Sequence, residues 1–269
     1  MNRAYKKPDI DVQNQPDTRH IEIDKVGVKD ISYPIGVLDR TGGVQRTVAH
    51  VNMYVNLPHQ FKGTHMSRFV ELLNEHCDNM TTTRIPRILR DMRKRLSARE
   101  AHIEVKFPYF ILKKAPVSGA EGLMTYDCTI RGFASDDVIL EIEVRIPVTA
   151  LCPCSKAISS AGAHNQRGIV TVRFRQERFV WIEEVIDLVE SSASCDVYSV
   201  LKREDEKYVT EKAYQNPMFV EDMARKVAQN LCGVEGINWF SVEVENQESI
   251  HAHNAYAYLE RTCLDNNGP

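Results

Sequence analysis

The segment Val138-Ile-Leu-Glu-Ile-Glu-Val-Arg-Ile146 decides the fold class that this sequence predicts. Apolar residues take every second position, and charged residues take most of the positions between them. This period of two is typical of a β-strand that buries one side and exposes the other. Antiparallel sheets with one solvated face have strands of this kind. Further strands are expected at residues 31–38, 49–55, 103–107, 123–133, 168–175, 240–244 and 255–259.

Helical stripes separate these strands in a repeated order. Apolar residues within 85–96 recur at i, i+3, i+4, i+7 and i+11, and residues 220–231 have the same spacing. Shorter stripes begin at Phe69 and Ile182. The order is therefore two strands, two helices and two strands, used twice. We predict an α+β fold of tandem ββααββ modules, in which two four-stranded antiparallel sheets are each covered on one face by two helices.

The predicted modules have unequal loops. Residues 1–30 are polar with little periodicity and are expected to form an N-terminal arm, followed by a first module at 31–136 and a second at 137–269. The second module has long links at about 151–167 and 191–215. Long loops within a compact domain are usually functional. Function is therefore expected in the second module.

Composition excludes several classes of protein. The 269-residue chain has 34 Lys and Arg against 37 Asp and Glu, a formal net charge of −3, so no nucleic-acid partner is expected. No apolar run approaches the ~18 residues of a membrane span, and the polar N-terminus is unlike a signal peptide. Seven cysteines, an odd number, favour free thiols in a reducing compartment. The sequence predicts a cytoplasmic protein without a membrane partner.

Thiols and imidazoles in the second module are candidate metal ligands. The first long link contains Cys152, Cys154 and His164, and the last hairpin contains His251 and His253. These side chains are soft and borderline ligands of the kind that zinc prefers. A lone Cys-x-Cys also describes ordinary packed cysteines. The five residues remain alternatives for three or four metal-coordination positions. The sequence does not decide between a structural and a catalytic metal site.

Polar and charged residues in three other segments are also candidates for a functional role. The run at 202–208 is interpreted as a solvated surface, from which no single carboxylate can be chosen as a ligand. Glu221 lies early in a helix expected to begin at Asn216-Pro217, where it could complement the helix dipole or accept the paired N–H groups of a guanine-like edge. Lys62, Ser67 and Arg68 precede a helix and could hold phosphate, or Ser67 could simply cap it. The remaining histidines are interpreted as surface or packing residues: His20, His50, His59, His76 and His102.

Several separated motifs together resemble the GTP cyclohydrolase IB family. The resemblance covers nearly all of the chain beyond the arm, and its specificity comes from the order of the motifs. They are Gly63-Thr-His-Met-Ser-Arg-Phe69, Leu151-Cys-Pro-Cys-Ser-Lys156, Ala163-His-Asn-Gln-Arg167, Asp205-Glu-Lys-Tyr208, the segment 216–222 and Glu248-Ser-Ile-His251.

The resemblance implies a fold, an assembly and a reaction. Members of that family have the tunnelling fold with two modules in one chain, and they form homotetramers whose barrels carry active sites at subunit interfaces. The implied reaction converts GTP and water to 7,8-dihydroneopterin triphosphate and formate, which begins tetrahydrofolate biosynthesis.

The resemblance also implies roles for single residues. Cys152, His164 and Glu206 match the metal ligands, which leave an open position for water, and Cys154 stands beside the metal. Zinc or manganese is expected, with iron as a further candidate, because a thiolate favours zinc and a carboxylate suits manganese. Glu221 matches the carboxylate that anchors guanine, and His251 is the acid–base candidate. The expected triphosphate ligands are Lys62, Arg68, Lys156 and Arg167.

Two other functions remain open on the sequence. One is a non-catalytic zinc-binding assembly protein, which would need a fourth ligand such as Cys154 or His253. The other is a tunnelling-fold enzyme acting on a related purine or pterin, such as a nitrile reductase. That enzyme would require a nicotinamide cofactor and a nucleophilic thiol free of metal.

Overall fold

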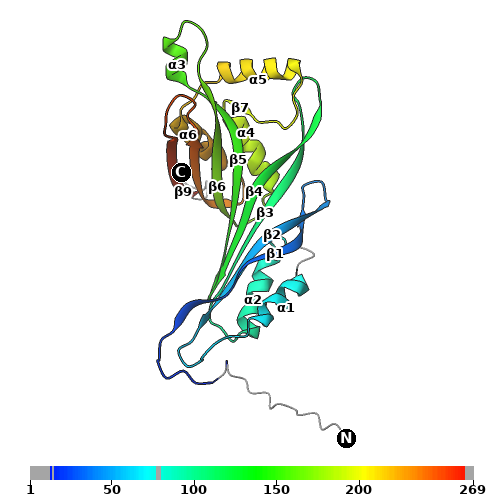
Figure 1. Cartoon of the computed structure of the whole chain (residues 1–269), viewed down its shortest axis with the longest axis vertical. Coiled ribbons are helices and arrows are strands. Elements are labelled where there is room, and N and C mark those ends of the chain that lie inside the picture. The colour runs from blue at the N-terminus through cyan, green and yellow to red at the C-terminus, as the bar shows by residue number, and fades with distance from the viewer. Residues whose placement is uncertain (1–12, 14, 77–79, 264–269) are drawn as a thin grey trace, which may run out of the picture.

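The molecule is elongated, and its long strands run along the long axis (Figure 1). The computed structural model describes residues 13, 15–76 and 80–263. Part of the expected N-terminal arm, residues 1–12 and 14, lies outside this range. Within it, the elements in chain order are β1 (Ile23–Leu38), β2 (Val44–Leu57), α1 (Ser67–His76), α2 (Ile85–Arg95), β3 (Ala101–Lys114), β4 (Glu121–Ala134), β5 (Val138–Leu151), α3 (Pro153–Ile158), β6 (Asn165–Gln176), α4 (Ile182–Ser192), β7 (Cys195–Asp196), α5 (Arg203–Gln215), α6 (Val220–Leu231), β8 (Ile237–Asn246) and β9 (Ala255–Thr262).

All nine described strands belong to one antiparallel sheet. Its order is β1-β2-β3-β4-β5-β6-β8-β9, and the short β7 pairs with β5. The two predicted four-stranded sheets are therefore a single sheet, which corrects the expectation. The junction is a tight turn in which the Ser135 N–H donates to the carbonyl of Asp137 at 3.0 Å, so that β4 and β5 pair directly as a hairpin.

The sheet has one apolar and one polar face. On β5, Ile142, Val144 and Ile146 are buried, and across the sheet their register partners on β6 are buried too. The intervening Glu141 and Glu143 point to the opposite face, where they pair with arginines on neighbouring strands. This alternation is the physical reason for the period of two in the sequence. A large continuous apolar core follows from it and extends across both halves, and a small second cluster joins Leu151, Cys195 and Ala213.

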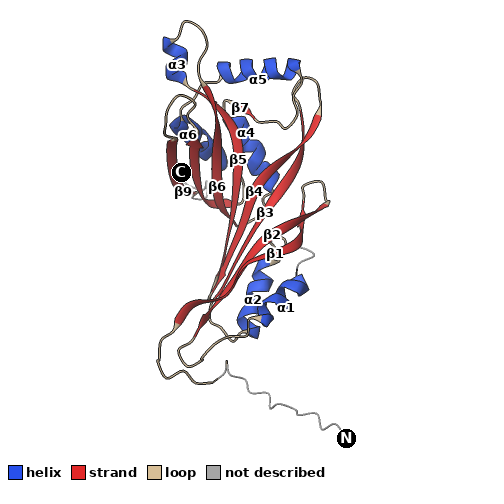
Figure 2. Cartoon of the chain, in the orientation of Figure 1, coloured by secondary structure: helices blue, strands red, loops and turns tan. Residues whose placement is uncertain are grey.

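Helices cover the apolar face in two pairs. Helices α1 and α2 lie beside the lower part of the sheet, and α4 and α6 lie beside the upper part (Figure 2). Helix α2 buries Ile85, Ile88, Leu89 and Met92 at the spacing that the sequence predicted. Gly132 of β4 permits this approach, because a Cβ there would lie 2.7 Å from the Cγ2 of Ile85. The prediction of two covering helices for each half is confirmed.

The loops contain more regular structure than expected. The 151–167 link contains helix α3 and the start of β6, and the 191–215 link contains β7 and helix α5. Strand β1 begins at Ile23, so the last eight residues assigned to the arm belong to the sheet. No helix of the described part is long and apolar enough to cross a membrane.

Candidate active site

Cys152 lies where β5 ends and helix α3 begins, toward the upper end of the molecule (Figure 1). It is the N-cap residue of α3, and its Sγ accepts a hydrogen bond from the backbone N–H of Ser155 at 3.5 Å. Pro153 at the first helical position suits this start, because its fixed φ favours a helix and it has no N–H to satisfy. Cys152 is half-buried and Cys154 is exposed.

His164 lies directly opposite Cys152. Strand β5 ends at Leu151, and β6 begins at its register partner Asn165. Just beyond this pair, the Cys152 N–H donates to the carbonyl of His164 at 3.2 Å. The hydroxyl of Ser155 then accepts from the His164 N–H at 3.1 Å. The strand pairing therefore brings together two of the sequence-predicted metal ligands.

Three polar side chains surround the inner nitrogen of His164, whose side chain is only 12% exposed. Nδ1 lies 2.8 Å from the amide oxygen of Gln166 and 3.4 Å from the hydroxyl of Ser249. Glu248 accepts from the Gln166 amide at 3.2 Å, which fixes that amide. An oxygen acceptor at this distance assigns the proton to Nδ1 and leaves the Nε2 lone pair available for a ligand bond.

The sequence reasoning missed these supporting residues. Gln166, the second residue of β6, follows His164 by two positions, and in an extended chain side chains two positions apart lie on one face. That spacing was the available signal for Gln166. Glu248 and Ser249 come from the segment after β8, and only the fold brings them to His164.

Asp205 anchors helix α5, which contradicts the prediction that the whole 202–208 run is a solvated surface. The side chain is fully buried. Its carboxylate accepts from the N–H groups of Val117 and Ser118 at 2.8 and 2.9 Å, and from the N–H of Lys202 at 2.8 Å. Burial raises the pKa of Asp205, but the hydrogen bonds from Ser118 and from the backbone outweigh it and hold the pKa well below its ordinary value. The adjacent Glu206 is exposed.

Two further contacts fix α5 against the rest of the site. The ammonium of Lys156 on α3 donates to the carbonyl of Tyr214 on α5 and lies 4.3 Å from the centre of its ring. Asp196 of β7 accepts from Lys212 at 2.9 Å and lies 3.3 Å from Lys113 Nζ. Burial raises the pKa of Asp196, but these two ammonium groups hold it below its usual range.

A complete ligand set is not assembled in this conformation. No three His, Cys, Asp or Glu side chains among the described residues stand close enough together to hold a metal ion. Cys152 and His164 fit a divalent metal as a thiolate–imidazole pair with a fixed tautomer. Glu206 lies on α5, which Lys156 links to α3. The three-ligand set therefore stays a prediction.

The other predicted residues are dispersed. Glu221 is exposed in the first turn of α6, which begins at Val220, whereas Asn216 ends α5 instead of starting α6. His251 and His253 are exposed between β8 and β9, with ring centroids 5.1 Å apart and rings 17° from parallel.

A cavity of about 340 Å³ is lined by the first residues of β6, Asn165 to Arg167, which directly follow His164; neither Cys152 nor His164 is among its lining residues. Arg167 lines it beside Gln166, the residue that orients His164, and Asp196 and Tyr198 form part of the wall.

Arg68, in contrast, lies at the start of α1, at the far side of the molecule from α3 (Figure 1), where it donates to the Arg95 carbonyl at 3.0 Å. Lys62 precedes α1 and is exposed.

Comparison with known proteins identifies the family. The model for type I GTP cyclohydrolase folE2 matches residues 10–257. A GTP cyclohydrolase FolE2 of Geobacter sp. (strain M21) is 56% identical over 264 residues, covering 97% of this chain and 99% of that protein. A GTP cyclohydrolase FolE2 of Geotalea uraniireducens (strain Rf4) is 57% identical over 251 residues, covering 93% of both. The chain therefore belongs to the FolE2 family of type I GTP cyclohydrolases. The resemblance is confirmed at the level of type I.

Solved structures show the fold alone. Uricase from Arthrobacter globiformis matches with a TM-score of 0.51 at 8% identity, covering 91% of this chain and 95% of that one. A urate oxidase variant from Bacillus sp. TB-90 matches with a TM-score of 0.54 at 9% identity, covering 89% and 98%. These are tunnelling-fold proteins, so the α+β part of the predicted fold class is confirmed, although the described strands form one sheet and not two. The oligomeric barrel stays a prediction.

We expect Asp205→Asn to destabilise the protein at neutral pH. Because the folded-state pKa of Asp205 is depressed, its contribution to stability is present above the ordinary carboxyl pKa of ~3.9 and is lost as the pH falls below that value. The free energy of unfolding, measured in denaturant from pH 7 to pH 3, should differ most between wild type and variant at pH 7. The difference should narrow as the pH falls toward 3, because the carboxyl group of the unfolded chain then becomes protonated. Glu204→Gln, in the same turn but exposed, is the matched control. A pH-independent difference would contradict this assignment.

Proposed function

We propose that this protein is a GTP cyclohydrolase I of type IB, which converts GTP and water to 7,8-dihydroneopterin triphosphate and formate in the first step of tetrahydrofolate biosynthesis. The observation that carries the proposal is 56% identity to a GTP cyclohydrolase FolE2 over 97% of the chain. The geometry supports it, because Cys152 and His164 stand side by side, and the residues that directly follow His164 line a cavity.

The proposed metal ligands are Cys152, His164 and Glu206, with zinc, manganese or iron as the metal. When bound, a divalent ion lowers the pKa of a coordinated water toward ~7 and so supplies hydroxide at neutral pH. The contribution of the chain is to hold the ligands. Gln166 keeps the proton of His164 on Nδ1, and the anchored α5 keeps Glu206 on a fixed helix. Cys154, two residues from Cys152, is proposed to stand beside metal and substrate.

The remaining roles concern the substrate. The Glu221 carboxylate is proposed to accept the paired N–H groups of the guanine edge, because an ionised carboxylate offers two acceptor oxygens. Water attack at C8 of guanine requires a proton on the ring nitrogen, and His251 is the proposed donor. Lys62, Arg68, Lys156 and Arg167 are proposed to neutralise the triphosphate.

We further propose that the active site is shared between subunits of a homotetramer. Arg68 and Lys62 belong to the segment around the start of α1, and Cys152 and His164 lie at the opposite end of the long sheet (Figure 1). One chain cannot bring both groups to one triphosphate. If both groups serve the same substrate, they must come from different copies, which agrees with an assembly that closes barrels across subunits.

Replacement of Cys152 by Ala should abolish metal binding and turnover. Loss of a residue that only supports a metal ligand typically costs about 10–100-fold, so loss of a ligand itself should reduce turnover by about 100-fold or more. Metal-stripped protein is supplied with GTP and Mn²⁺ or Zn²⁺, the product is oxidised, and neopterin fluorescence is measured. Cys232→Ala, an exposed thiol at the end of α6, is the control. Full turnover by the Cys152→Ala protein would refute the ligand assignment.

Sharing of the site between subunits can be tested by complementation. Cys152→Ala and Lys62→Glu subunits, each carrying a different affinity tag, are co-expressed and mixed assemblies are isolated. Each variant alone should be nearly inactive at limiting GTP, and the mixture should regain part of the activity, because some sites receive an intact Cys152 from one copy and an intact Lys62 from another. Mixed assemblies as inactive as the parents would show that each site lies within one chain.

A further inference from the structure

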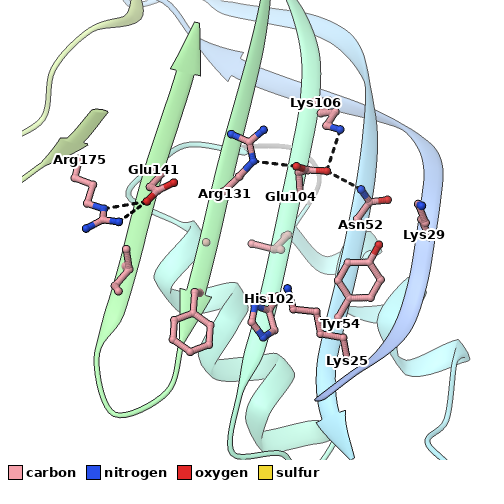
Figure 3. A pocket seen from close by; sticks show the side chains of 14 residues that line it. Lys25, Lys29, Asn52, Tyr54, His102, Glu104, Lys106, Arg131, Glu141 and Arg175 are labelled. Carbon is pink, nitrogen blue, oxygen red and sulfur yellow. Dashed lines mark hydrogen bonds and ion pairs between the residues drawn. The ribbon is translucent and has the colours of Figure 1, made fainter. Parts of the chain in front are cut away.

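A larger cavity, of about 520 Å³, lies on the polar face of the sheet in the N-terminal half. Its walls contain none of the residues assigned to GTP or to the metal. Figure 3 shows its side chains rising from successive strands, with Lys25 and Lys29 on β1 and Arg175 on the far side. Five Lys and Arg side chains line it against two carboxylates, Glu104 and Glu141. The cavity therefore carries an excess of positive charge.

The two carboxylates are already engaged by three of the cations. Glu104 pairs with Arg131 at 3.0 Å and with Lys106 at 3.1 Å. Glu141 accepts from the Nε of Arg175 at 3.0 Å. Burial raises the pKa of Glu104, but its hydrogen bonds and Lys106 outweigh that effect, so it is ionised at neutral pH. Lys25 and Lys29 therefore supply two of the three surplus positive charges.

Lys25 and Lys29 have no carboxylate partner within the described part of the chain. Both side chains are exposed. The pairing of β1 with β2 shifts register at residues 23–26 and again at 28–31, so each lysine lies within an irregularity. Such bulges redirect side chains and are common beside functional sites. Gly27 between them lies so close to β2 that a Cβ would meet the Met53 carbonyl oxygen at 2.0 Å.

Aromatic rings form the neighbouring wall. Lys25 extends past the Tyr54 ring toward His102 in Figure 3. The centroid of the His102 ring lies 4.8 Å from that of Phe133. Burial lowers the pKa of His102, and the charge of Lys25 lowers it further. Two free ammonium groups next to half-buried rings can hold an anion at one end and a planar group at the other.

We propose that this cavity is a second ligand site, which binds a small anion with several negative charges, of the phosphate-chain class. Lys25 and Lys29 supply the charge-assisted hydrogen bonds, and the paired Arg131 and Arg175 add positive potential around them. The phosphate chain could be free or part of a nucleotide, and Tyr54, His102 and Phe133 would then contact the base. This site is independent of the proposed catalytic function.

Calorimetric titration of the full-length protein with inorganic tripolyphosphate, and separately with adenosine triphosphate, tests the proposal. Lys25→Ala/Lys29→Ala should weaken the binding by about tenfold or more, because each charge-assisted hydrogen bond makes a substantial contribution. The matched control is Lys94→Ala/Lys114→Ala, which removes two exposed lysines that do not line the cavity. Lys25→Arg/Lys29→Arg keeps the charge and should retain binding.

The titration has results that support the site and results that overturn it. Affinity lost only in the Lys25→Ala/Lys29→Ala protein supports the site. Equal affinity for the two probes then identifies a free phosphate chain as the ligand, and tighter binding of adenosine triphosphate identifies a nucleotide. Absence of binding to the wild type, or equal binding by the Lys25→Ala/Lys29→Ala protein and its control, would overturn the proposal. The titration measures binding and not turnover. A negative result would therefore overturn this site without bearing on the proposed GTP cyclohydrolase activity, which is measured separately.

Discussion

The antiparallel pairing of β5 with β6 is the constraint on which the candidate active site depends. The ladder runs from Ile142 opposite Phe174 to Leu151 opposite Asn165, and its apolar side is buried under helices. A slip of one residue would turn that apolar side to the polar face, so the register is strongly specified. Because the register is fixed, the two residues just beyond its last pair, Cys152 and His164, must face each other. Burial of the apolar face of the sheet thus determines where the two candidate metal ligands lie.

A second constraint comes from two carboxylates, the buried Asp205 and the half-buried Asp196, which hold α5 at the same end. They connect this helix to the β3–β4 turn, to β7 and to β3. Carboxylates withdrawn from water are tolerated only when several donors satisfy them, and both have such donors. Helix α5 carries Glu206, and Lys156 links it to the helix that follows Cys152. Electrostatics therefore positions the part of the site that apolar packing does not.

Much of this arrangement could be predicted from local pattern. Alternation in 138–146 and the helical spacing of 85–96 identified strands and helices, because each element buries one side. Fusion of the two sheets could not be predicted, since it depends on the turn at Ser135–Asp137 and on β4 pairing with β5. Asp205 was missed because a buried carboxylate within a charged run has the same local pattern as a solvated one. Its partners come from residues 117–118, far away in sequence.

The sequence motifs identified some residues of the candidate site and not others. They named Cys152 and His164, and the strand pairing brings these together, whereas the orienting contacts of Gln166, Glu248 and Ser249 emerge only in the fold. The same applies to His102, which the sequence placed among surface or packing histidines and which lines the cavity on the polar face. Residues whose role depends on distant partners carry no local signal.

X-ray absorption at the metal edge of the zinc-loaded protein tests the central claim most directly. The account predicts one sulfur ligand at ~2.3 Å together with nitrogen and oxygen ligands at ~2.0–2.2 Å, from Cys152, His164, Glu206 and water. Two sulfur ligands would contradict it, because Cys154 would then close the site as in a structural zinc centre. A spectrum without sulfur would place the metal elsewhere in the molecule.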